Sequence, residues 1–199
     1  MKFKGEIKMP SRVQLKTWAK EQIKENIGIL FVCSLIAGLI AGAASITGIG
    51  AILLAPPLSI ALIRIYLNLI RGTKPEVGHI FTGFDVFTQS VLLNLLMGIF
   101  IMLWSLLFYV PGIIKALSYS MSNYILAENP EMTWQQALDE SKKMTEGHKM
   151  EIFVLELSFI PWILLTGITF GLAGIYVIPY MSATMANYYN ELKKVAIIN

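Results

Sequence analysis

Two ionisable residues lie inside long apolar runs, where an isolated charge is costly. Arg64 lies seven residues before Arg71, which closes one run, and Glu156 lies seven residues after Lys149, which opens another. With a helical rise of about 1.5 Å per residue, both side chains lie roughly 10 Å deep in a membrane. Ionisable groups at such depth pair with one another and mark functional sites by default. We therefore predict an ion pair between Arg64 and Glu156, with either a structural role or a role in gating or proton coupling.

Other polar residues in apolar surroundings lack the spacing that catalysis or metal binding requires. We expect Ser118, Ser122, Asn123 and Asn187 to face the interior of a helix bundle, because polar side chains avoid lipid. No pair of acids and histidines has the spacing of metal ligands, so no zinc site is predicted at His148. No nucleotide-binding loop or nucleophile elbow occurs. We expect no catalytic residue, cofactor or metal; a membrane-embedded enzyme is a minor alternative.

The composition places these residues in a membrane protein. Hydrophobic residues make up 55 % of the 199 residues and charged residues only 15 %, whereas a soluble domain carries about 25 % charge. The formal net charge of +3 comes from residues that flank the apolar runs, so nucleic acid is not expected as a partner. The single cysteine, Cys33, excludes an intrachain disulfide.

Six apolar runs predict six membrane-spanning helices, joined in pairs by very short turns, because a helix needs about 20 apolar residues to cross a bilayer. The runs are residues 27–45, 51–70, 86–108, 113–127, 150–166 and 171–189. Residues 1–26 form a basic amphipathic helix capped by Ser11, a pattern typical of a segment that lies on an anionic membrane surface. Residues 77–84 predict a short interfacial helix. The predicted fold class is all-α: a polytopic membrane bundle of about six transmembrane helices with amphipathic interfacial helices.

Residues 128–149 are a long polar segment between the first four spans (residues 27–127) and the last two spans with a short tail (residues 150–199). Thr133 followed three residues later by Gln136 is a capping box, which predicts the start of a docked amphipathic helix. We expect this helix to contact a partner or lipid headgroups. The candidate contact residues are Trp134, Leu138, Lys142 and Lys143.

Lysine and arginine gather at one end of the six runs. Of the 16 lysines and arginines, 14 lie at the end that holds both termini and residues 72–85 and 128–149; Arg64 and Lys115 are the other two. The positive-inside rule places that end in the cytoplasm. The three turns at the opposite end are only a few residues long, which disfavours an extracellular receptor. We therefore expect a multi-pass protein of the cytoplasmic membrane with both termini in the cytoplasm.

The second and sixth runs are similar to each other. A shift of 123 residues aligns Pro56 with Pro179 and Tyr66 with Tyr189. Both an internal duplication and the shared constraints of membrane helices explain these matches.

Short motifs in a fixed order resemble the domain-of-unknown-function family 975. They are LWSLLFYVPGIIKALSYSM at residues 103–121, AENP at 127–130, SKKMTEGHK at 141–149, LSFIPW at 157–162, IPY at 178–180, RG at 71–72 and IFTGF at 80–84. The resemblance covers nearly the whole chain and implies a small bacterial integral membrane protein, with no established activity or cofactor. Pro161 stands where the family pattern has a glycine, and predicts a kink in the fifth span.

Two functional classes follow from these features. The first is a non-catalytic accessory or protective membrane protein that acts through its cytoplasmic face, with the bilayer and another membrane protein, such as a transporter, as partners. The second is a small-solute transporter or channel with a polar cavity inside the bundle. Proline-bearing spans and buried charges favour the second class. The small size and the lack of a central set of binding residues favour the first.

Overall fold

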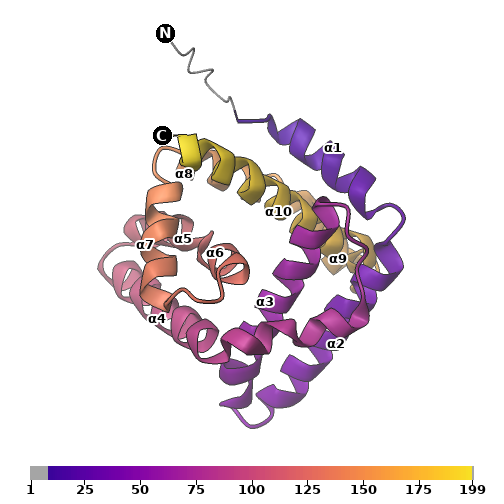
Figure 1. The fold of residues 1–199 in the computed structure, drawn as a ribbon, viewed down its shortest axis with the longest axis horizontal. Coiled ribbons are helices and arrows are strands. Elements are labelled where there is room, and N and C mark those ends of the chain that lie inside the picture. Colours follow the sequence, from indigo (N-terminus) through magenta and orange to yellow (C-terminus); the bar gives the residue numbers. More distant parts are fainter. Residues whose placement is uncertain (1–8, 199) are drawn as a thin grey trace.

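The structure, a computed structural model that describes residues 9–198, consists of helices packed around one central helix. In chain order the helices are α1 (Arg12–Ile23), α2 (Ile27–Ser45), α3 (Gly50–Ile70), the 3-10 helix η1 (Val77–Val86), α4 (Phe87–Leu107), α5 (Tyr109–Tyr119), α6 (Ser122–Glu128), α7 (Trp134–Met144), α8 (Lys149–Leu157), α9 (Ile160–Ile168) and α10 (Gly174–Ile198). The central helix α3 packs against α2, η1, α4, α6 and α10 (Figure 1). The described residues contain no strand, so the predicted all-α class is confirmed.

Four segments of the described chain are long and apolar enough to cross a membrane. They are Ile27–Ser45, Gly50–Ile70, Val77–Leu106 and Lys149–Ile168. The first three predicted spans agree with α2, α3 and α4 to within one residue at each end. The chain is therefore a membrane-embedded helical protein, whereas the predicted count of six spans is not confirmed.

The predicted fourth span is interrupted after Tyr119, where α5 ends and α6 begins three residues later. A side chain of α7 lies at this break: the Ser141 hydroxyl accepts a hydrogen bond from the Met121 amide at 3.3 Å and donates one to the Ser118 carbonyl at 2.8 Å. An inserted side chain that bonds the freed backbone groups is an ordinary cause of a helix break. The hydropathy of residues 113–127 gave no sign of this break, because it depends on a residue of another helix.

The predicted fifth span is also interrupted, between α8 and α9. Pro161 lies in the first turn of α9, as the predicted kink requires. The Trp162 amide bonds to the Phe159 carbonyl and leaves the Ser158 carbonyl to an outside donor, the Lys16 ammonium, at 3.1 Å. The predicted sixth span corresponds to α10, which runs on to Ile198. Its C-terminal half is too polar for it to qualify as a span by hydropathy.

The two predicted amphipathic helices form as expected. Ser11 caps α1 in a capping box with Gln14, and Thr133 caps α7 in a capping box with Gln136. Residues 1–8 of the predicted basic N-terminal segment lie outside the described residues. Helix α1 runs along α10 (Figure 1) and buries Leu15, Ala19 and Ile23 against the bundle. Residues 77–84 are helical as predicted, but in the 3-10 form.

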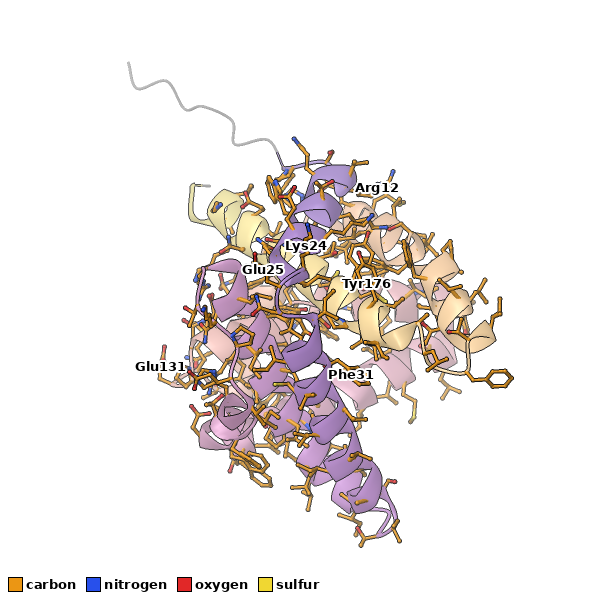
Figure 2. All side chains as sticks on the ribbon, turned by 90° about the vertical axis from the view of Figure 1, so that its right-hand side faces the viewer. Arg12, Lys24, Glu25, Phe31, Glu131 and Tyr176 are labelled. Carbon is orange, nitrogen blue, oxygen red and sulfur yellow. The ribbon has the colours of Figure 1, made fainter. Side chains whose placement is uncertain are left out.

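The helix pairs end in apolar tips. The largest exposed side chains there include Ile46 between α2 and α3, at 87 % exposure, and Phe170 between α9 and α10, at 99 %. Figure 2 shows Arg12, Lys24 and Glu25 together near α1, with the hairpin of α2 and α3 extending away from them past Phe31. The charged residues and the apolar tips of this hairpin are thus at opposite ends.

Candidate functional site: a charged cavity at the end of α3

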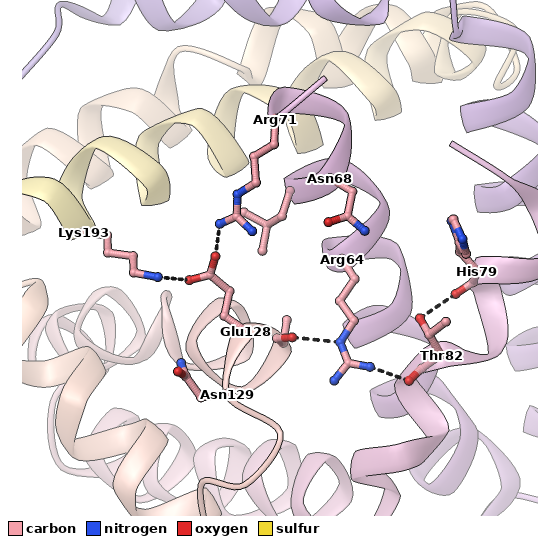
Figure 3. Close-up of a pocket in the computed structure, with 10 residues that line it drawn as sticks. Arg64, Asn68, Arg71, His79, Thr82, Glu128, Asn129 and Lys193 are labelled. Carbon is pink, nitrogen blue, oxygen red and sulfur yellow. Dashed lines mark hydrogen bonds and ion pairs between the residues drawn. The ribbon is translucent and has the colours of Figure 1, made fainter. Parts of the chain in front are cut away.

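A cavity of about 440 Å³ lies beside the C-terminal end of α3 and is called the charged cavity below. Its lining comes from α3, η1, α6 with the loop after it, and α10 (Figure 3). The lining residues are Arg64, Leu67, Asn68, Arg71, His79, Thr82, Ala127, Glu128, Asn129 and Lys193. The consecutive elements α3 and η1 therefore meet the more distant α6 and α10 around one polar space.

Arg64 ties three of these elements together. Its Nε donates a hydrogen bond to the Ala127 carbonyl at 2.8 Å, and one terminal nitrogen bonds to the Thr82 carbonyl and to both carboxylate oxygens of Asp85, each at 2.9 Å. The last carbonyls of a helix lack partners within it, so Ala127 at the end of α6 is a suitable acceptor. The Arg64 side chain is only 16 % exposed, so these bonds hold a mostly buried guanidinium in place.

The predicted ion pair between Arg64 and Glu156 is corrected by this geometry. The carboxylate that pairs with Arg64 is Asp85, at the end of η1. Glu156 is exposed on α8, and it makes no salt bridge or side-chain hydrogen bond with any residue in the range 9–198. Position along a helix gives depth in a membrane but not direction around the helix axis, so equal depth did not identify the partner.

Glu128, the last residue of α6, is the second anchor of the cavity. Its carboxylate accepts hydrogen bonds from the Arg71 guanidinium, from the Lys193 ammonium at 2.6 Å and from the Tyr189 hydroxyl at 2.7 Å. Its side chain is only 8 % exposed. A carboxylate at a helix C-terminus is disfavoured by the helix dipole, and the two cations offset that cost. Sequence reasoning missed this residue; the available signal was an acid directly after an apolar run.

The cavity carries an excess of positive charge. Three cations, Arg64, Arg71 and Lys193, face two carboxylates, Asp85 and Glu128, which leaves a formal excess of one. Burial and the neighbouring Arg71 guanidinium lower the pKa of Lys193, while its ion pair with Glu128 favours the charged form. Within residues 9–198, no group of three or more His, Cys, Asp or Glu gathers that could hold a metal ion. The cavity thus offers charge and hydrogen bonding.

The other polar residues predicted for the bundle interior form separate contacts and do not line the charged cavity. Asn123 exchanges hydrogen bonds with Asn94 of α4 at 3.0 and 3.2 Å. Asn187 exchanges them with Gln22 of α1 at 2.6 and 3.2 Å. Ser118 is buried and bonds to the carbonyl one turn before it, and Ser122 is buried without a hydrogen-bond partner among the described residues. Arg64 alone of the predicted intramembrane polar residues reaches the cavity.

The four residues of α7 that are predicted to contact a partner divide into two pairs. Leu138 is 3 % exposed, and Trp134 is half-buried with its amide bonded to the Gln89 side chain, so these two dock the helix on the bundle. The prediction of a partner contact at Leu138 is therefore wrong, because the apolar face of α7 is already covered. Lys142 and Lys143 are exposed, each beside an acid three residues earlier.

Comparison with known proteins agrees with the sequence motifs. No curated protein and no solved structure matches the chain at a significant level. A family model described as "Protein of unknown function (DUF975)" matches residues 1–118 and 110–196, nearly the whole chain. The chain therefore belongs to the DUF975 family of proteins of unknown function.

Proposed function

We propose that this is a non-catalytic membrane protein that acts through its cytoplasmic face, with the charged cavity as its working part. The observation that carries the proposal is the position of the cavity. It lies where the C-terminal ends of α3 and α6 meet Lys193 of α10, close to the start of residues 128–149. This is the end of the bundle that the positive-inside rule assigns to the cytoplasm.

The opposite end supports the proposal because it offers little to a soluble partner. The three turns between paired helices carry no lysine or arginine. The exposed side chains at this end are large and apolar: Ile46 and Phe170 in two of the turns, and Leu106 in the last turn of α4, are each more than 80 % exposed. Such side chains suit the membrane interface better than water. Binding of a solute or partner is therefore expected at the charged end.

An accessory or protective role fits this arrangement, since the charged end also presents α7. Its exposed face carries Lys142 and Lys143, whose ion pairs with Asp139 and Glu140 lie on the surface, where another membrane protein or anionic headgroups can reach the two ammonium groups. We expect the protein to reside in a bacterial cytoplasmic membrane with both termini in the cytoplasm.

Transport of a small solute is the second candidate, and one observation favours it. Two of the predicted spans are broken in the middle, at α5/α6 and at α8/α9, and helix pairs of this kind form ion and substrate sites in transporters. Against it, Ser141 and Lys16 already bond to the backbone at these breaks. Near the α5/α6 break Asn123 is paired with Asn94 of α4, although the buried Ser122 hydroxyl has no partner among the described residues.

The orientation is tested by cysteine labelling in sealed membrane vesicles. Cys33 is the only cysteine and is buried, so Cys33→Ala gives a cysteine-free protein. One reporter cysteine is then introduced, either Glu131→Cys before α7 or Phe170→Cys at the opposite tip. A membrane-impermeant maleimide should label Glu131→Cys in inverted vesicles and not in right-side-out vesicles. Labelling of Glu131→Cys only in right-side-out vesicles would overturn the cytoplasmic assignment.

The two functional classes are separated by reconstitution. Liposomes that contain the purified protein should pass protons and small ions, under an imposed membrane potential, no faster than protein-free liposomes. A faster flux that Arg64→Gln abolishes would replace the accessory role with transport.

A further inference from the structure

We propose that the charged cavity binds an oxyanion of the phosphate class, supplied by a phosphate-bearing solute or by the headgroup of an anionic lipid. The inference rests on the proposed function, because it names the ligand of the same cavity.

The cations are placed for an oxyanion. Arg64 and Arg71 lie two turns apart on α3, and Lys193 approaches from α10 on the other side of the space (Figure 3). Arginine is suited to phosphate because its planar fork of donors matches two phosphate oxygens at once. One terminal nitrogen of Arg64 has no hydrogen-bond partner among the described residues, and neither has the side-chain amide of Asn68. Unused donors therefore remain at the site.

Glu128 shows that this set of donors accepts an oxyanion. Its carboxylate is held by a guanidinium, an ammonium and a tyrosine hydroxyl, from α3 and α10. A phosphate would meet the same donors, and it would compete with Glu128 for Arg71 and Lys193. Glu128 therefore limits the affinity for phosphate, and its neutralisation should tighten binding while loss of either cation should weaken it. Phosphate affinity should thus change in opposite directions when the carboxylate is neutralised and when a cation is removed. A merely structural cluster would not give this result.

The location admits both sources of phosphate. The cavity lies beside the last two turns of α3, a candidate membrane span, so it extends from about 10 Å inside the membrane at Arg64 to the headgroup layer of the cytoplasmic leaflet at Arg71. Basic pockets between membrane helices at this level bind anionic lipid headgroups. The volume of about 440 Å³ also leaves room for the remainder of a small phosphate-bearing solute.

The test compares adjacent lysines on purified full-length protein. Lys193→Gln removes a cavity cation, and Lys194→Gln removes an equal charge from the next residue, which pairs with Glu191 outside the cavity. In neutral detergent, binding of inorganic phosphate is measured by calorimetry. In a second arm, the protein is purified from vesicles of phosphatidylglycerol and phosphatidylcholine, and retained lipid is identified by native mass spectrometry.

The expected result is that Lys193→Gln loses about tenfold in affinity, the effect of one charge-assisted contact, and that Lys194→Gln retains wild-type affinity. Glu128→Gln should bind phosphate more tightly than wild type; where it fails to fold, Arg71→Gln must show the same loss as Lys193→Gln. Phosphate binding in detergent assigns a soluble ligand, whereas retention of phosphatidylglycerol alone, lost in Lys193→Gln, assigns a lipid headgroup. The proposal would be overturned if Lys193→Gln and Lys194→Gln bound phosphate and retained lipid equally well, or if the wild-type protein bound neither phosphate nor phosphatidylglycerol. Either outcome would leave the cysteine-labelling test of orientation unaffected.

Discussion

Replacement of Gly83 by alanine should destabilise the protein strongly, because η1 lies against the backbone of α3 at this residue. A Cβ atom at Gly83 would lie 2.0 Å from the Pro57 carbonyl oxygen and 2.8 Å from the Ala61 nitrogen. Both neighbours are main-chain atoms inside α3, so they cannot move as a flexible side chain would. The whole of η1 must therefore shift away from α3.

The size of the effect follows from the cost of overpacking. Forcing one extra methyl group into a packed interior costs about 1 to 3 kcal/mol, and the upper end applies here because rigid backbone must move. For a chain of this length, 1 kcal/mol lowers the melting temperature by about 2 to 4 °C. Gly83→Ala should therefore lower it by roughly 6 to 12 °C.

The matched control is Gly78→Ala on the same 3-10 helix, where an added Cβ meets nothing within 4 Å. Melting followed by far-UV circular dichroism in detergent should place Gly78→Ala within about 2 °C of wild type, the range of a neutral surface change. Thr82 and Asp85, which flank Gly83, both bond to Arg64, so Gly83→Ala should also weaken anion binding in the cavity. If Gly83→Ala melted together with Gly78→Ala, the close approach of η1 to α3 would be refuted.

Three further outcomes are expected. Thr133→Ala removes the cap of α7 and should cost about 0.5 to 2 kcal/mol, seen as faster hydrogen exchange at the start of α7; equal exchange in both proteins would contradict it. A double-mutant cycle with Asn94→Ala and Asn123→Ala should give a coupling energy of about 0.6 kcal/mol, the usual strength of such bonds between membrane helices, and additive effects would show that the two amides do not interact. Burial, then Arg12 and Lys20, lower the pKa of Lys16 from 10.5. The unfolded chain therefore binds more protons than the folded chain between that lowered pKa and 10.5, so the unfolding free energy should rise with pH across this window, and Lys16→Met should remove the rise.

The sequence predicted the parts of the fold that depend on one segment at a time. The hydropathy of residues 27–45 and 51–70 located α2 and α3, because burial in lipid is a property of a continuous run. The capping boxes at Ser11 and Thr133 located the starts of α1 and α7, because each cap is made within one turn.

The candidate site depends on how separate segments pack against one another, and the hydrophobic periodicity of one segment does not specify that packing. Arg64 was predicted to be important from its depth, but its partner Asp85 is reached only because η1 folds back along α3. Glu128, Arg71 and Lys193 lie in three separate charged segments of the sequence. Their meeting depends on the angle at which α6 and α10 approach α3, and no single-segment pattern encodes that angle.

The amphipathic helices α1 and α7 have a role that follows from the two breaks in the predicted spans. A broken membrane helix leaves backbone groups without partners, at a cost that forbids exposure to lipid. At α5/α6 the missing partner is Ser141 of α7, and at α8/α9 it is Lys16 of α1. The Lys16 ammonium also lies 4.4 Å from the centre of the Phe159 ring at the same break. Each broken span thus depends on a polar helix from another part of the chain, so α1 and α7 cannot be removed from the bundle without exposing these breaks.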